Sequence, residues 1–103
     1  MTKPKVITIC GSSQFKGAIM GVTQRLTLHG NIVIHHGFFH HRDMVPITDE
    51  QKKELDELMF RKIDISDAIH VVNVNGYIGS TTRAAIEYAK DKKLGITYEE
   101  PLE

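Results

Sequence analysis

Val6-Ile7-Thr8-Ile9-Cys10 is a short, nearly continuous run of apolar and β-branched residues, and Gly11-Ser12-Ser13 ends it. A strand of this composition suits burial on both faces, which is typical of a parallel sheet with helices on either side. Residues 68–74 (Ala-Ile-His-Val-Val-Asn-Val) have the same character, and a glycine-containing segment follows them as well. The two runs predict adjacent parallel strands in the middle of an α/β sheet.

The rest of the chain alternates between helical and strand patterns. Apolar residues recur at helical spacing over 15–28, and Gly30 follows as a stop signal. Thr48 and Gln51 form a capping box before an apolar stripe, which predicts a helix over 48–65. The remaining predicted elements are a strand at 31–39, a helix at 80–93 and a short strand at 94–98.

This order predicts one domain over residues 1–103. Right-handed crossovers between successive parallel strands give a three-layer open sheet of the flavodoxin-like, or Rossmann-like, type. We expect about four strands in the order 2-1-3-4.

Composition bounds the class of protein. A chain of 103 residues can bury roughly two-thirds of its unfolded surface, enough for a core. Lys+Arg and Asp+Glu both number 13, so the formal charge is zero, which argues against polymeric nucleic acid or a membrane as partner. The single cysteine, Cys10, and the short apolar run at the start favour a cytoplasmic setting.

In open parallel sheets, ligands bind beyond the carboxyl ends of the strands, where the strand order reverses. Here that point lies between the first and third strands, and it brings together two loops rich in glycine and hydroxyl groups. The second loop opens a helix whose free N–H groups favour an anion. The candidate ligand-binding residues in these loops are Gly11, Ser12, Ser13, Tyr77, Gly79, Ser80 and Thr81.

Neither loop matches a complete phosphate-binding motif. The segment Gly76-x-x-Gly79 lacks the lysine of a Walker loop and the spacing of G-x-G-x-x-G. Turn geometry is the structural alternative for the glycines, and a helix N-cap is the alternative for Ser80 or Thr81. We expect neither a cofactor nor a metal.

Three segments together resemble the nucleoside 2-deoxyribosyltransferase superfamily, which includes the 2'-deoxynucleoside 5'-phosphate N-hydrolases. They are Ile9-Cys10-Gly11-Ser12, residues 62–67 and residues 79–89. The resemblance implies a flavodoxin-like sheet, a homo-oligomer, and cleavage or transfer at the N-glycosidic bond of a nucleoside or nucleotide. It also implies a glutamate nucleophile near the start of the helix after the third strand, helped by an aspartate on the preceding helix.

The sequence departs from the family at both positions. Arg83 stands at the nucleophile position and Met59 at the aspartate position. Glu87, one turn after Arg83, is the candidate displaced catalytic carboxylate, with an ion pair to a neighbouring cation as the alternative. Asp64 and Asp67 are the nearest candidates for a second carboxyl, and Arg83 is better placed to bind a phosphate.

Two functional hypotheses therefore stay open. One is an N-glycoside hydrolase or deoxyribosyltransferase acting on a small nucleoside or nucleotide. The other is a non-catalytic nucleotide-binding or sensor module with a degenerate active site. A structural protein with a vestigial pocket is a third, less informative possibility.

A histidine-rich segment follows the second predicted strand. Its spacing lacks the i,i+4 pairs of a helical metal site, and no cysteine lies nearby. We expect a lid or a base-stacking surface there, with Phe38 and Phe39 supplying aromatic faces. The histidines concerned are His35, His36, His40 and His41.

The helix over 48–65 carries bulky residues beyond a narrow apolar stripe, among them Met59 and Phe60. We therefore expect a homodimer or a larger homo-oligomer that uses helix faces and partly closes the site.

Overall fold

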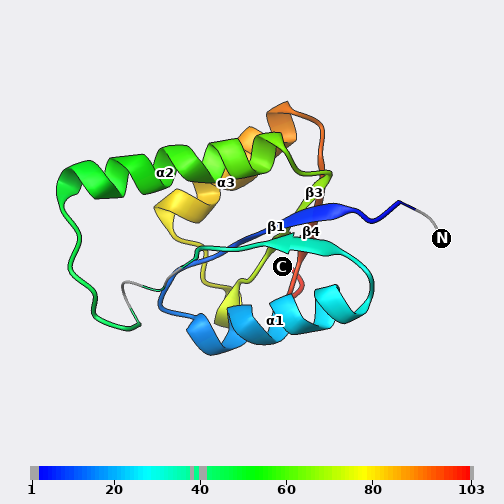
Figure 1. The fold of residues 1–103 in the computed structure, drawn as a ribbon, viewed down its shortest axis with the longest axis horizontal. Coiled ribbons are helices and arrows are strands. Elements are labelled where there is room, and N and C mark those ends of the chain that lie inside the picture. Colours follow the sequence, from blue (N-terminus) through cyan, green and yellow to red (C-terminus); the bar gives the residue numbers. More distant parts are fainter. Residues whose placement is uncertain (1–2, 38, 40–41, 103) are drawn as a thin grey trace.

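A computed structural model describes residues 3–37, 39 and 42–102 (Figure 1). The elements, in chain order, are β1 (Val6–Cys10), α1 (Lys16–Leu28), β2 (Ile32–Ile34), α2 (Asp49–Asp64), β3 (Ala68–Val71), the short 3-10 turn η1 (Val74–Gly76), α3 (Ser80–Asp91) and β4 (Gly95–Tyr98). Within these described residues, no helix combines the length and the apolar character needed to cross a membrane.

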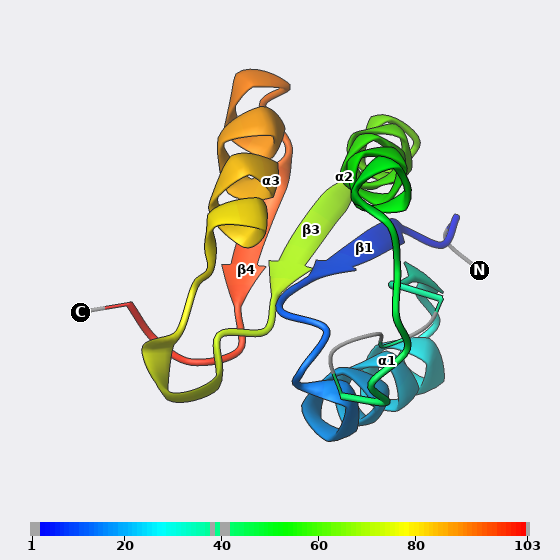
Figure 2. The ribbon, with the colours of Figure 1, turned by 90° about the vertical axis from the view of Figure 1, so that its left-hand side faces the viewer.

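The four strands form one parallel sheet in the order β2-β1-β3-β4. The central strands β1 and β3 pair directly, with Ile7 opposite Ala68 and Cys10 opposite Val71. Helix α1 covers one face of the sheet, and α2 and α3 cover the other (Figure 2). The predicted three-layer open sheet and its strand order are confirmed.

Both faces of the central strands are buried, each in its own core. Between the sheet and α2/α3, Ile63, Ile69 and Val71 are fully buried together with residues of α3. On the α1 face, Ile9 packs with Ile19 and other buried residues. Because successive side chains of a strand point to opposite faces, a strand covered on both sides must be apolar at nearly every position, as β1 and β3 are.

Two strands are shorter than the sequence predicted. The second strand ends at Ile34 rather than at residue 39. The histidines after it make other bonds: His35 O accepts a hydrogen bond from Lys62 Nζ, and the His36 ring bonds to Gly11 O. The chain therefore leaves the sheet edge and lies over the end of β1.

The third strand ends at Val71 rather than at residue 74. Asn73 is fully buried, and its side-chain amide bonds to the backbone of Glu100 in both directions, at 2.8 and 2.9 Å. The segment after β4 thus provides the hydrogen-bond partners of Asn73. The 3-10 turn η1 follows, and β3 does not continue.

Candidate functional site

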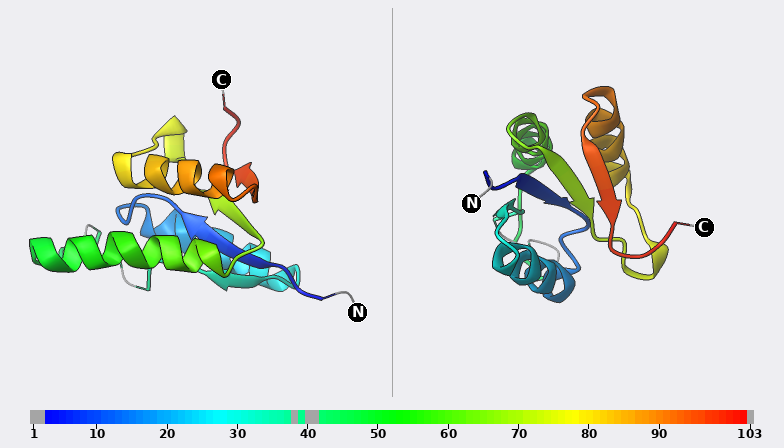
Figure 3. Two further views of the ribbon diagram at one scale, coloured as in Figure 1. Left: turned by 90° about the horizontal axis from the view of Figure 1, so that it is seen from above. Right: turned by 90° about the vertical axis from the view of Figure 1, so that its right-hand side faces the viewer.

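A cavity of about 300 Å³ lies at the carboxyl ends of β1 and β3. Its walls come from the loop after β1, the start of α3 and one side of α2, and Figure 3 shows α2 and α3 next to each other on the same face of the sheet. This is the point where the strand order reverses, and the two loops predicted from the sequence meet there. The lining residues are Cys10, Gly11, Ser12, Ser13, His36, Lys52, Leu55, Asp56, Met59, Lys62, Tyr77, Gly79, Ser80, Thr81, Thr82 and Ala85.

All seven loop residues named as candidate ligand-binding residues line this cavity, whereas Arg83 and Glu87 do not. Glu87 is exposed and lies 3.5 Å from Lys90 Nζ, an ion pair of the kind that was the alternative to a catalytic role. The structure therefore does not bring Glu87 to the ligand-sized space.

The two aspartates considered as a second carboxyl lie at the opposite edge of the sheet. The side chain of Asp67 accepts a hydrogen bond from Val6 N at the start of β1, at 2.8 Å. Asp64 forms ion pairs with Arg61 and Lys92. The hypothesis that either carboxyl assists at the site is wrong, because the amino ends of parallel strands lie at the far edge from the cavity.

Close backbone approach explains two of the glycines. A Cβ on Gly11 would lie 3.0 Å from the carbonyl oxygen of Val72, so the loop after β1 passes tightly against the end of β3. A Cβ on Gly79 would lie 3.1 Å from the hydroxyl oxygen of Tyr77, whose ring folds over that glycine and meets Phe15 edge to face at 5.8 Å. The Tyr77 ring thus forms a wall at the start of α3.

Helix α3 begins without a side-chain cap. Gly79 is its N-cap residue, and Ser80 and Thr81 are the first two helical residues, so the alternative that either one caps the helix is wrong. The first backbone bond of the helix joins Arg83 N to Gly79 O. The earlier N–H groups have no acceptor within the helix, and the positive end of the helix dipole adds to them at the cavity.

Helix α2 supplies polar groups that the sequence reasoning missed. Lys52, Asp56 and Lys62 line the cavity together with two apolar residues of the same helix face. Lys52 Nζ lies 2.7 Å from Asp56 Oδ1 and 3.3 Å from Thr81 Oγ1, so it connects α2 to the start of α3. A carboxylate therefore does lie on the preceding helix, one turn before Met59. The recognisable signal was the i,i+4 spacing of Lys52 and Asp56, which places these two residues on one helix face; the position of Lys62 had no such signal.

The inner end of the cavity contains Cys10, Lys62 and His36. Burial raises the pKa of Cys10 to about 12, so it stays a thiol at neutral pH and is no nucleophile. Burial also lowers the pKa of Lys62, whose Nζ donates to His35 O at 2.9 Å. His36 Nε2 carries a proton, because it lies 2.7 Å from the carbonyl oxygen of Gly11, which can only accept.

The histidine-rich segment is not an aromatic lid in its described part. Phe39 is only 4% exposed and belongs to the core under α1, where the rings of His35 and His36 stack on it. A base-stacking role for Phe39 is therefore wrong. Phe38, His40 and His41 lie outside the described residues. Among the residues that are described, no three His, Cys, Asp or Glu side chains gather in a group that could hold a metal.

Comparison with protein-family models, with curated proteins and with solved structures found no match to this chain. The resemblance to the deoxyribosyltransferase superfamily thus rests on the three sequence segments alone.

Proposed function

We propose that the protein binds a small phosphorylated ligand of the nucleoside monophosphate type in this cavity, without cleaving its glycosidic bond. The observation that carries the proposal is the meeting of three features at one wall of the cavity. These are the uncapped start of α3, the hydroxyl of Thr81 and the ammonium of Lys52. Backbone N–H groups, a hydroxyl and a lysine are the groups that proteins use to hold phosphate.

The other walls suit the rest of such a ligand. A volume of about 300 Å³ is at the lower end of the range for small-molecule sites. Leu55, Met59 and Ala85 offer apolar surface, while Asp56 and Ser12 offer polar contacts for sugar hydroxyls. The lining has two lysines and one carboxylate, which favours a ligand with net negative charge.

The same lining argues for binding without turnover. Retaining glycosidases use two carboxyl groups about 5–5.5 Å apart, whereas the described lining residues include Asp56 as the one carboxylate. Asp56 is engaged with Lys52 at 2.7 Å, and the Cys10 thiol is protonated at neutral pH. This composition favours the binding or sensor hypothesis over the hydrolase.

The test introduces a negative charge at the start of α3. Ser80→Asp should keep the fold, because an acidic side chain in the first helical turn is favourable, yet it should repel a phosphate. We expect calorimetry with nucleoside 5'-monophosphates to show at least about a tenfold loss of affinity relative to the native protein. Gln24→Asp, the same change of charge on exposed α1 across the sheet, is the matched control and should bind normally. Equal affinity in both variants would place the ligand elsewhere.

A second candidate function is N-glycosidic cleavage that uses Asp56. The observation that favours it is the presence of this carboxylate inside the cavity, one turn from the position where the resemblance expects an aspartate. Release of free base from a bound nucleotide, abolished by Asp56→Asn and retained by Glu87→Gln, would establish cleavage. Binding without base release in the native protein would eliminate it.

A further inference from the structure

We propose that Lys62 forms a reversible imine with the carbonyl group of a small phosphorylated aldehyde, such as an open-chain sugar phosphate, in the same cavity. The proposal rests on the proposed function, which supplies the phosphate subsite. It goes beyond that function because it assigns a covalent bond to Lys62.

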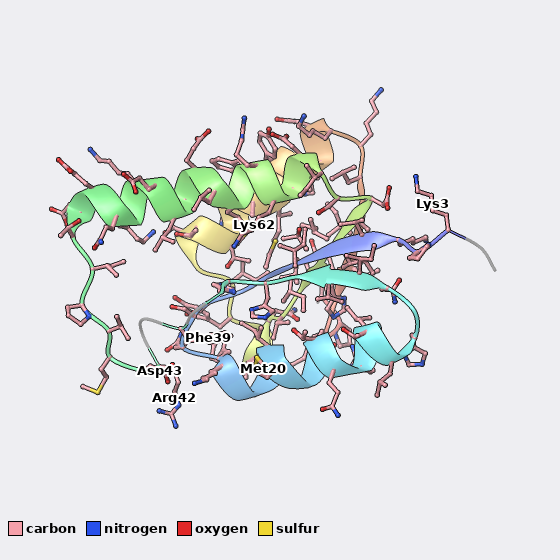
Figure 4. All side chains as sticks on the ribbon, in the orientation of Figure 1. Lys3, Met20, Phe39, Arg42, Asp43 and Lys62 are labelled. Atoms are coloured by element: carbon pink, nitrogen blue, oxygen red, sulfur yellow. The ribbon has the colours of Figure 1, made fainter. Side chains whose placement is uncertain are left out.

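The backbone of Lys62 is held firmly. Its carbonyl oxygen accepts hydrogen bonds from Ser66 Oγ at 2.7 Å and from Thr8 Oγ1 at 3.3 Å, and both of these residues are buried. Figure 4 shows Lys62 on the side of α2 that faces the sheet. With its tip bonded to His35 O, the side chain is fixed at both ends along the cavity wall.

The two lysines that line the cavity differ in their charged neighbours. Lys52 forms an ion pair with Asp56 at 2.7 Å. Lys62, by contrast, makes no ion pair with any of the described residues and is half-buried beside the uncharged Cys10 thiol. Burial without a nearby carboxylate disfavours the charged form, and the pKa of Lys62 is lowered accordingly. A larger share of neutral amine is what nucleophilic attack on a carbonyl requires.

The position of Lys62 relative to the phosphate subsite sets the class of ligand. Lys52 and Lys62 are ten residues apart on one helix, or about 15 Å along its axis at 1.5 Å per residue. Lys52 Nζ reaches Asp56, which is six residues or about 9 Å along the axis from Lys62, and both lysines line the same cavity. A small ligand whose anionic group lies at Lys52 can therefore present a carbonyl group to Lys62. An aldose phosphate in its open-chain form has this arrangement.

The reaction balances without any further reagent. The lone pair of neutral Nζ attacks the carbonyl carbon, the C–N bond forms, and the carbonyl π electrons move to oxygen. Transfer of one proton from nitrogen to that oxygen gives a carbinolamine. Loss of the hydroxyl group with a second proton from nitrogen gives the C=N bond and one water molecule, and the steps are reversible.

The experiment treats the whole protein with D-glyceraldehyde 3-phosphate and sodium cyanoborohydride near neutral pH, then maps the reduced adducts by peptide mass spectrometry. We expect at least about tenfold more adduct on Lys62 than on Lys53, an exposed lysine of the same helix. Glyceraldehyde without phosphate should label Lys62 less, and inorganic phosphate should compete with the phosphorylated probe. Lys62→Arg keeps the charge and should remove this adduct while leaving that on Lys53 unchanged.

Labelling of the lysines in proportion to their exposure, with Lys62 no higher than Lys53, would overturn the proposal. Because Lys62 and Lys53 are compared within the native protein, the result does not depend on whether a variant folds. Nucleotide binding that Ser80→Asp weakens, together with no preference for Lys62, would reject the imine and leave the proposed function intact. Preferential labelling of Lys62 by glyceraldehyde 3-phosphate, without nucleotide binding, would reject the nucleotide ligand and retain the imine. Equal labelling of Lys62 by glyceraldehyde and its phosphate would overturn the part of the proposal that requires a phosphorylated ligand.

Discussion

Gly11 affects the site through the absence of a side chain. Its loop passes so close to the end of β3 that an added Cβ would lie 3.0 Å from Val72 O and 3.4 Å from Val72 Cβ. Both neighbours belong to the central strand region and cannot move without disturbing the sheet. We therefore expect Gly11→Ala to destabilise the protein by about 1–3 kcal/mol, the usual cost of overpacking. Urea denaturation measures the change.

Gly21→Ala is the matched control for this prediction. Gly21 lies inside α1, and a Cβ there would meet no atom within 4 Å. Alanine should therefore stabilise the helix by about 0.5–1 kcal/mol. Destabilisation of similar size by both substitutions would contradict the close-approach argument for Gly11.

Glu99, which follows β4, bonds to side chains of α1 and β3 on the α1 face of the sheet. Its carboxylate accepts two hydrogen bonds from Arg25, at 2.7 and 3.0 Å, and lies 2.9 Å from His70 Nε2. The hydrogen bonds from Arg25 are the largest cause that lowers the pKa of Glu99 from 4.5 to about 2. Since the folded protein favours the ionised form, this stabilisation is complete above pH 4.5 and is lost as the pH falls through about 2.

Glu99→Gln should consequently be less stable than the native protein at neutral pH, by about 1 kcal/mol because the pair is partly exposed to solvent. The difference between the two proteins should shrink as the pH falls below 4.5 towards 2. Urea midpoints measured across this range test it. Glu57→Gln, which removes an exposed carboxylate 3.5 Å from Arg61, should change little at any pH. A pH-independent difference for Glu99→Gln would show that its role is not electrostatic.

Residue by residue, the sequence could predict only part of the site. The loop residues Gly11 and Gly79 could be placed at the site from topology alone, because the carboxyl ends of adjacent parallel strands lie at the same edge of the sheet. Lys52, Asp56 and Lys62 could not be found in this way. Which residues of a helix face a cavity depends on how the helix rotates when it packs, and charges at helical spacing usually form a solvated face.

Among the elements, α2 shows best how a local signal becomes a wall of the site. The Thr48 hydroxyl accepts from Gln51 N at 3.1 Å, and Gln51 Oε1 accepts from Thr48 N at 2.9 Å. This capping box was predicted from the sequence because it involves only neighbours in the chain. It fixes the helical turn that carries Lys52, the residue that reaches Thr81.

Thr48→Ala should therefore cost about 1 kcal/mol of stability, as loss of an N-cap does, and should also weaken binding of a phosphorylated ligand. Thermal denaturation and calorimetry measure the two effects. Thr27→Ala is the control, since Thr27 Oγ1 bonds within α1 to Thr23 O and caps no helix. A loss of stability without any change in ligand affinity would show that Lys52 does not contribute to ligand binding.

The ends of β2 and β3 were less predictable than the start of α2. β-Branched residues continue past β3 at Val72 and Val74, so local preference favours extension there, whereas the paired histidines after β2 carry no clear stop signal. Long-range bonds end them instead: His36 to Gly11 after β2, and Asn73 to Glu100 after β3. Neither partner lies near in sequence, and only the assembled fold brings each pair together.

On the scale of the whole molecule, a second hollow between α2 and α3, here called the surface groove, adjoins the cavity. This groove is lined by Asp56, Met59, Phe60, Ser80, Thr81 and Ala84, and several of these residues also line the cavity. A second copy of the chain packed on the groove would cover the open side of the site. The homo-oligomer expected from the sequence therefore has a definite candidate surface.

We predict a dimer or larger assembly whose interface includes Ala84, an exposed residue of α3 in this groove. Ala84→Glu should shift the mass measured by light scattering to that of the monomer, because a buried, unpaired charge is costly at an interface. Ligand affinity should fall together with the mass, since the cover of the site is lost. Ala18→Glu, the same change on exposed α1, should leave both unchanged. A monomer mass for the native protein at high micromolar concentration would reject the assembly. Loss of ligand affinity in Ala84→Glu without a change in mass would show that the groove takes part in ligand binding and not in assembly.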